Sequence, residues 1–184
     1  MSPVVTYAPP IMAIVFASLW VWKRFLRVPK SHRRRIRAAD RALAKLSEIQ
    51  SPAARFAWLR KMDPFTFEEM ILTALKREGA KIKRNRRYTG DGGADGRAVI
   101  NGETHLIQAK RYSGHINAAD VREFASLCAA NGVKGLFVHS GKTGGGSIVA
   151  MGSGVVRIVS GQGLLTLFDP DQRLFSDAVK GDPS

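Results

Sequence analysis

The period of the apolar positions changes several times along this chain, and each change marks a predicted element. Apolar residues recur at helical spacing in some segments and form short runs bounded by turn signals in others. The predicted elements are a helix over 63–78, strands over 81–87, 95–100 and 103–110, a helix over 118–130, strands over 134–140 and 155–159, and a helix over 163–168. This order of helix, three strands, helix and strand indicates an α/β domain.

One dipeptide fixes the register of two of these strands. Asn101-Gly102 joins them and is typical of a two-residue hairpin loop. Counting down the ladder from such a loop brings Asp95 opposite Gln108, and opposed residues project from the same side of a sheet. Lys110 lies two residues after Gln108 and projects from that side as well. We therefore expect a carboxylate, an amide and an ammonium group to converge on one face.

These three side chains have the chemistry of a metal-dependent hydrolase. The Asp95 carboxylate, the Gln108 side-chain carbonyl and the backbone carbonyl of Ala109 are the hard oxygen ligands that Mg²⁺ prefers. Beside such an ion, Lys110 could orient or deprotonate a water molecule and offset charge on a phosphate. The alternative is a polar strand pair on a solvated sheet. The apolar residues of the second strand favour a buried strand, where an unpaired amide or ammonium is costly.

The preceding helix offers another acid. Glu68 lies on the border of the apolar stripe of this helix, whereas Glu69 is aligned with Thr73 and Lys76, toward the expected solvent side. A carboxylate buried on that border needs a partner. The alternative is an ordinary charged residue that reaches water.

The start of the chain has a different composition. The residues from Pro3 to Trp22 carry no charge and, at about 1.5 Å per helical residue, would cross roughly 30 Å of hydrocarbon. Basic residues follow this run, which argues against a cleaved signal peptide and places the N-terminus outside by the positive-inside rule. This pattern predicts a single-pass protein of the inner membrane, in contact with lipid, with the remaining chain in the cytoplasm.

Most of the net charge of +14 lies next to that run. Residues 23–62 carry 13 basic and 2 acidic side chains, and helices are expected over 31–49 and from Ser51-Pro52 onward. The arginines of this connector suit an anionic lipid surface, a DNA backbone or both. The single cysteine, Cys128, excludes an intramolecular disulfide. The glycines at 144–146 predict a flexible loop.

Three motifs together resemble a known family. The run TGDGGADG, the run IQAKRY after it and the helix containing Phe67-Glu68 before it resemble the Mrr-type restriction endonuclease domain of the PD-(D/E)XK nuclease superfamily. The resemblance implies an α-β-β-β-α-β core and the use of Mg²⁺, for which Mn²⁺ can substitute. By motif it implies Asp95 as the metal-binding aspartate, Gln108 in place of the usual acid, Lys110 as the catalytic lysine and Glu68 as the first-helix acid.

The sequence thus predicts a membrane-anchored, metal-dependent DNA endonuclease that acts in restriction of foreign or modified DNA. Its predicted parts are an anchor at 1–30, a basic connector at 31–62, a nuclease domain at 63–168 and a polar tail at 169–184. The basic residues assigned to DNA binding are Arg33, Arg34, Arg35 and Arg111. Two alternatives stay open: a tethered DNA-binding module without cleavage activity, and a junction or repair nuclease of the same superfamily. A homodimer also stays open.

Overall fold

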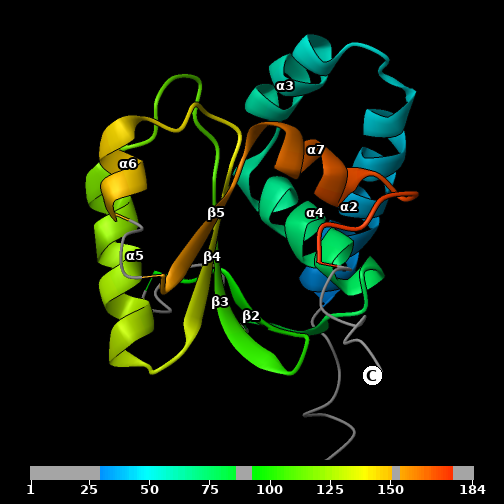
Figure 1. Cartoon of the computed structure of the whole chain (residues 1–184). Coiled ribbons are helices and arrows are strands. Elements are labelled where there is room, and N and C mark those ends of the chain that lie inside the picture. Colours follow the sequence, from blue (N-terminus) through cyan, green and yellow to red (C-terminus); the bar gives the residue numbers. More distant parts are fainter. Residues whose placement is uncertain (1–29, 86–92, 151–153, 176–184) are drawn as a thin grey trace, which may run out of the picture. The chain divides into compact units, whose positions relative to one another are not determined.

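The computed structural model describes residues 30–85, 93–150 and 154–175 (Figure 1). Arg35–Ser184 forms one compact unit, which contains all the strands described here, and the chain up to Arg34 forms another. The elements are α2 (Lys30–Glu48), α3 (Pro52–Lys61), α4 (Pro64–Arg77), β1 (Lys81–Arg84), β2 (Gly96–Ile100), β3 (Glu103–Lys110), α5 (Ala118–Ala130), β4 (Lys134–His139), α6 (Gly145–Ala150), β5 (Val156–Val159) and α7 (Gly161–Phe168).

The strands form one mixed sheet in the order β1-β2-β3-β4-β5. β1, β2 and β3 are joined as an antiparallel meander, and β4 and β5 then add to β3 in parallel. The crossover from β3 to β4 contains α5, as a parallel pair requires. The predicted order of helix, three strands, helix and strand is confirmed as α4, β1, β2, β3, α5 and β4.

The hairpin between β2 and β3 has the predicted loop. Asn101 and Gly102 have φ values of 50° and 83°, as a type I′ turn requires. The register predicted from this loop is confirmed from Ile100 opposite Glu103 down to Gly96 opposite Ile107. The ladder ends there, one pair short of the predicted pair between residues 95 and 108.

A change of backbone hydrogen bonding at Asp95 ends the ladder. The Asp95 N–H donates to the carbonyl of Ile107, at 2.7 Å, and the Asp95 carboxylate turns to the chain of β3. The prediction that Asp95 pairs with Gln108 is therefore corrected. The carboxylate is aimed at the β3 backbone instead of projecting from the sheet beside Gln108.

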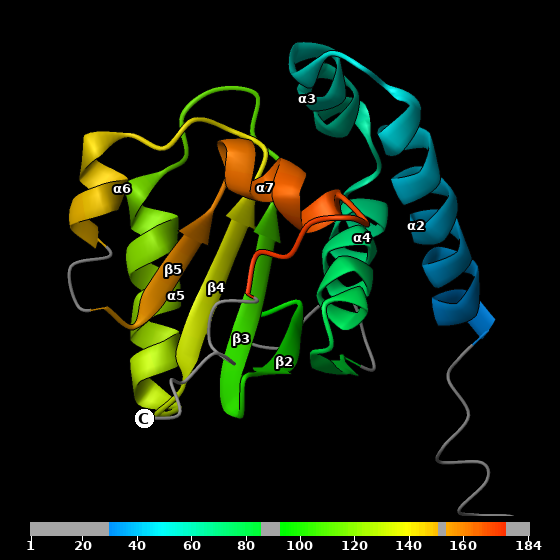
Figure 2. The same ribbon diagram turned by 45° about the vertical axis from the view of Figure 1, so that its right-hand side comes forward.

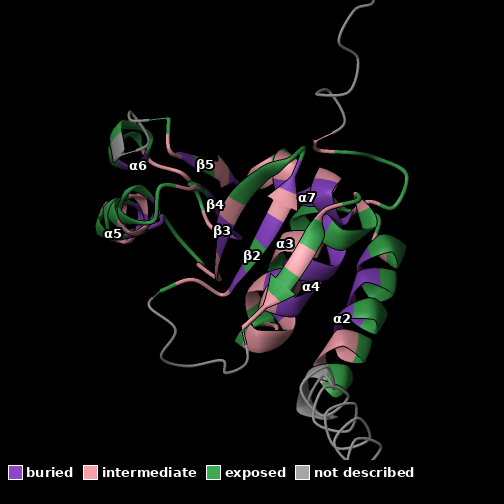
Figure 3. Ribbon diagram, turned by 90° about the horizontal axis from the view of Figure 1, so that it is seen from below, coloured by how far each residue is buried: buried purple, intermediate pink, exposed green. Residues whose placement is uncertain are grey.

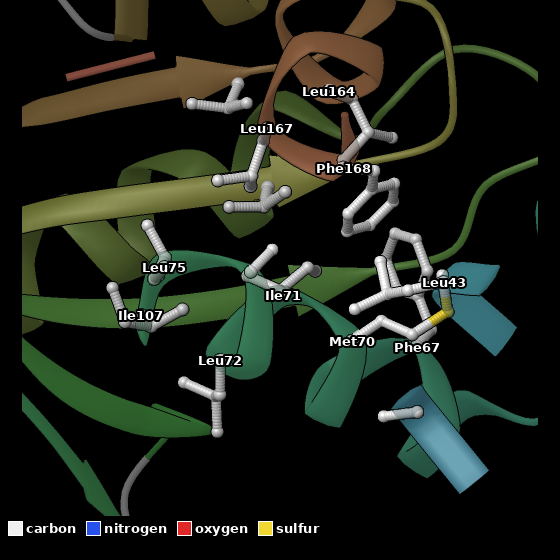
Figure 4. Packing of buried hydrophobic residues seen from close by; sticks show 14 of the residues in the cluster. Leu43, Phe67, Met70, Ile71, Leu72, Leu75, Ile107, Leu164, Leu167 and Phe168 are labelled. Atoms are coloured by element: carbon white, nitrogen blue, oxygen red, sulfur yellow. The ribbon is translucent and has the colours of Figure 1, made fainter. Parts of the chain in front are cut away.

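Helices cover both faces of the sheet (Figure 2). α5 and α6 lie on one side, where Leu106 of β3 packs with Phe124 and Phe137. α4 and α7 lie on the other side, where Ile107 packs with the stripe of α4. Figure 4 shows this larger cluster, in which the rings of Phe67 and Phe168 meet edge to face with centroids 6.3 Å apart.

α2 belongs to the same core from Arg35 onward. Its apolar residues Ala39, Leu43 and Leu46 are buried in the cluster that contains α4 and α7. Buried and exposed positions alternate along this helix (Figure 3), which is the pattern of an amphipathic surface helix. An ion pair of 3.0 Å between Asp40 and Arg77 adds a polar contact between α2 and α4.

The structure corrects two predictions about single segments. Glu69 does not face solvent: it is 1% exposed, and the Nε of Arg84 lies 2.8 Å from its carboxylate. The reason is that β1 packs against α4 and brings an arginine to this side of the helix. The glycine run does not form a loop throughout, because residues 145–150 form α6.

The predicted single-pass localisation is also corrected. Across residues 30–85, 93–150 and 154–175, no helix combines the length and the apolar character needed to cross a membrane. The span predicted from Pro3 to Trp22 lies outside the described residues.

Candidate active site

Asp95 lies immediately before β2. The N–H of Ala109 donates to its Oδ2, at 2.7 Å, which fixes the carboxylate against β3. Burial raises the pKa of Asp95 to about 6, although the Ala109 amide and Lys110 act in the lowering direction. The group that the sequence singled out is therefore a half-buried carboxylate held by one backbone donor.

Glu68 approaches Asp95 from α4. Burial, followed by the repulsion of the Asp95 carboxylate, raises the pKa of Glu68 to about 8, and Arg35 opposes this rise. The intermediate exposure of Glu68 agrees with its predicted place on the border of the apolar stripe. Two carboxyl groups that repel each other in a partly buried site would be stabilised by a divalent cation.

The side chain of Gln108 best tests whether these residues suit a metal ion. Its side-chain Oε1 is buried and has no hydrogen-bond partner within the described part of the chain. A buried amide oxygen without a partner costs about 1–3 kcal/mol, so its presence calls for an explanation. A metal ligand is one, because a metal ion would take up the lone pair that the protein leaves unused. The residues present thus fit an oxygen-bound cation.

Lys110 lies on the same face of β3 as Leu106 and Gln108, toward α5. Its Nζ is 3.0 Å from the Oδ2 of Asp120, on α5, and its charge also lowers the pKa of Asp95. The structure therefore relates Lys110 to two carboxylates, of which sequence reasoning named one. Asp120 was missed because an acid in the first turn of a helix is normally explained by the helix dipole.

The four arginines assigned to DNA binding have different surroundings. Arg33 and Arg34 are exposed. Arg35 lies over the ring of Phe65, 4.3 Å from its centroid, and influences Glu68 electrostatically. Arg111 donates from Nη1 to the carbonyl of Arg60, at 2.9 Å. The last two arginines thus also have contacts within the domain, next to the candidate site.

The described residues contain no second candidate for a metal site or a nucleophile. They contain no group of three or more His, Cys, Asp or Glu residues that could hold a metal. Cys128 is buried, and burial raises the pKa of its thiol to about 11, which does not suit a nucleophile. Asp95 and Glu68, which interact electrostatically, are the two acids that the sequence singled out in this part of the chain.

A comparison with protein families decides the relationship. The model of the Mrr catalytic domain, described as a restriction endonuclease, matches residues 59–168, which is more than half of the chain. The chain belongs to this restriction endonuclease family. The match runs from α3 to the end of α7, so this Mrr-type restriction endonuclease domain contains the whole sheet and all of Glu68, Asp95, Gln108 and Lys110.

Comparisons with individual proteins add less than the family match. The Mrr-type domain is similar to a solved structure of the MspJI restriction endonuclease in complex with a 27-mer oligonucleotide, with 20% identity and a TM-score of 0.36. The similarity covers 63% of this chain and 33% of that one, so this chain spans about a third of that enzyme's length. A comparison with curated proteins gave no match.

Proposed function

We propose that this chain is a metal-dependent endonuclease that hydrolyses phosphodiester bonds of DNA and acts in restriction of foreign or modified DNA. The observation that carries the proposal is the buried Oε1 of Gln108, which has no hydrogen-bond partner among the described residues. It lies in a domain of the restriction endonuclease family, in which the carboxyl groups of Asp95 and Glu68 repel each other. An unsatisfied buried oxygen is costly, and so are two carboxyl groups that repel each other; a DNA-binding domain without chemistry has no need of either.

In this proposal three groups hold the cation: the carboxylate of Asp95, the side-chain oxygen of Gln108 and the backbone carbonyl of Ala109. Mg²⁺ is the expected ion and Mn²⁺ a substitute, because both accept oxygen ligands and keep bound water. The bound ion would supply charge to the scissile phosphate and lower the pKa of a coordinated water molecule. The Ala109 N–H holds the Asp95 carboxylate in place at 2.7 Å.

Lys110 and Glu68 each interact electrostatically with Asp95. The Lys110 ammonium is proposed to stabilise the negative charge that develops on the phosphate and to orient the attacking water. Glu68 has a pKa raised to about 8, so at neutral pH it can hold or accept a proton beside Asp95. Binding of a cation would favour its ionised form, because the cation removes the repulsion between the two carboxylates.

DNA contacts are proposed for four arginines. Arg33 and Arg34 are exposed and suit the phosphate backbone. Arg35 and Arg111 lie within the domain, so for them phosphate contact is proposed in addition to their contacts with Phe65 and Arg60. Contacts of this kind position DNA without reading its sequence.

The test is cleavage of plasmid DNA by the full chain with Mg²⁺, with Mn²⁺ and with EDTA. The parent is expected to nick DNA with either metal, and Asp95→Asn and Lys110→Ala are expected to lose at least about 100-fold in rate. Asp171→Asn is the matched control, since it removes an exposed carboxylate in the chain after α7 and should cleave like the parent.

Equal nicking by the parent, Asp95→Asn and Lys110→Ala would exclude the proposed site. Salt-sensitive binding of DNA without cleavage in any metal would favour the alternative of a DNA-binding module. Branched, methylated and unmodified substrates should be compared in the same assay. A strong preference for branched DNA would favour a junction or repair nuclease over restriction.

A further inference from the structure

Lys110 is held from the side of α5 by a residue that the motif does not contain. The Oδ2 of Asp120 lies 3.0 Å from the Nζ of Lys110, and the same oxygen accepts a short hydrogen bond from the hydroxyl of Tyr112. Asp120 is 24% exposed and Lys110 36%, so the pair is only partly open to solvent. Such a pair is screened less than one on an open surface.

Tyr112 is itself fixed to the sheet. Its backbone N–H donates to the hydroxyl of Ser140, which is buried just after β4. That hydroxyl donates to the Tyr112 carbonyl, and both distances are 3.2 Å. Gly141 lets the two segments approach, because a Cβ there would lie 2.6 Å from the Cβ of Tyr112. The phenol that reaches Asp120 therefore starts from a well-defined backbone position.

Asp120 has a fixed position at the start of α5. It lies in the first turn of α5, where Asn117 caps the helix by accepting from the N–H of Ala119. The hydrogen bond from Tyr112, and then the interaction with Lys110, lower the pKa of Asp120. An ionised carboxylate in this turn also interacts favourably with the helix dipole. The anion that faces Lys110 is thus held in place by the helix and by the tyrosine.

A lysine side chain needs such a support. Fixing it in one rotamer costs about 2 kcal/mol of conformational entropy, and its ammonium has no preferred direction of its own. Here the Lys110 charge acts on Asp95 on one side and pairs with Asp120 on the other. Without the second carboxylate, the ammonium would be free to collapse onto Asp95 or to turn into solvent.

We infer that Asp120, supported by Tyr112, is a positioning residue that holds the Lys110 ammonium at the place where it acts on the phosphate. The inference rests on the proposed function and extends it to a residue of α5. Asp120 acts through Lys110 and does not itself ligate the metal. Restriction of the ammonium to one position should raise the rate of the chemical step and leave the affinity for DNA unchanged.

The test compares Asp120→Asn and Tyr112→Phe with the parent, in the full chain. Single-turnover cleavage is expected to slow about 10- to 100-fold in Asp120→Asn and less in Tyr112→Phe, while the Kd for DNA in EDTA stays within about twofold. Asp120→Glu keeps the charge and should recover part of the rate. Glu123→Gln removes an exposed carboxylate from the same helix and should behave like the parent.

A double variant separates positioning from general damage to the fold. If Asp120 acts through Lys110, adding Asp120→Asn to Lys110→Ala should cause no further loss of rate. A further loss as large as that in the parent background would overturn the inference. Cleavage by Asp120→Asn at the parent rate would also overturn it, and would leave the proposed function intact.

A second measurement does not need cleavage. NMR relaxation of the Lys110 Cε methylene should show a more mobile side chain in Asp120→Asn than in the parent or in Glu123→Gln. Unchanged mobility would refute the contact on which the inference rests. If the parent itself cleaves no DNA with either metal, the proposed function fails, and the catalytic part of the inference fails with it.

Discussion

At the scale of single residues, the site is defined by two carboxyl groups whose pKa values lie above the usual range. Burial raises the pKa of Asp95 to about 6 and that of Glu68 to about 8, and the two carboxylates repel each other. Such clusters are typical of sites that bind a cation or move a proton.

Glu68→Gln tests this electrostatic cost. The pKa of Glu68 rises from 4.5 to about 8 on folding, so between these pH values the folded chain binds the proton more tightly than the unfolded chain. The parent therefore loses stability as the pH rises through this window, and the glutamine variant does not. In metal-free buffer the variant should become more stable than the parent by about 1–2 kcal/mol at pH 9, with little difference near pH 5.

Thermal melts from pH 5 to pH 9 measure this difference. Glu123→Gln removes an exposed carboxylate and should follow the parent at every pH. A constant offset between Glu68→Gln and the parent across the range would show that Glu68 ionises normally in the folded chain.

At the scale of elements, α4 joins the fold to the site. One side of this helix buries Phe67, Met70 and Ile71 between the sheet, α7 and α2, and its border carries Glu68 toward Asp95. The helix position is fixed by packing, so the carboxylate it carries is fixed as well. α2 contributes to this packing through Ala39, Leu43 and Leu46.

Leu43→Ala tests the contribution of α2. Leu43 is 2% exposed in the main cluster, so its truncation should cost about 2–4 kcal/mol of the free energy of unfolding. Ile148→Ala is the control, because Ile148 on α6 is 55% exposed and should cost less than about 0.5 kcal/mol. Urea unfolding measures both values, and equal effects of the two substitutions would mean that α2 does not pack as described.

At the scale of the whole molecule, the compact unit begins within the basic segment. Arg35–Ser184 forms one unit, so most of α2 folds together with the family domain. The family match itself begins at residue 59. The helical segment before it thus serves as part of the core, in addition to any contact that its exposed arginines make with DNA.

Truncation tests this boundary. A chain that begins at Lys30 should unfold at about the temperature of the full chain, because it keeps the whole of α2. A chain that begins at Ser51 loses four buried apolar residues, Ala39, Ala42, Leu43 and Leu46, and should melt lower by on the order of 10 °C. Calorimetry of the two truncated chains decides the question, and equal melting temperatures would contradict the role assigned to α2.

The local features of this protein could be predicted from its sequence. A two-residue type I′ loop requires positive φ at both positions, which Asn-Gly tolerates well. The loop and the register of its hairpin therefore follow from Asn101-Gly102. The spacing of apolar residues predicted the helices and the order of the elements, because this spacing is a property of neighbouring residues in the sequence. The same reasoning predicted that Asp95, Gln108 and Lys110 share one face; the structure brings the Lys110 charge near Asp95, but turns the Asp95 carboxylate to the backbone of β3.

Contacts between distant segments were decided by the tertiary structure. Glu69 is buried because Arg84 of β1 reaches it, and the spacing within α4 alone favoured solvent. Lys110 meets Asp120 because the crossover brings α5 over the same face of β3. The sequence determines which groups are available, but burial and the pairing of charges depend on which surfaces pack together, and local spacing does not contain that information.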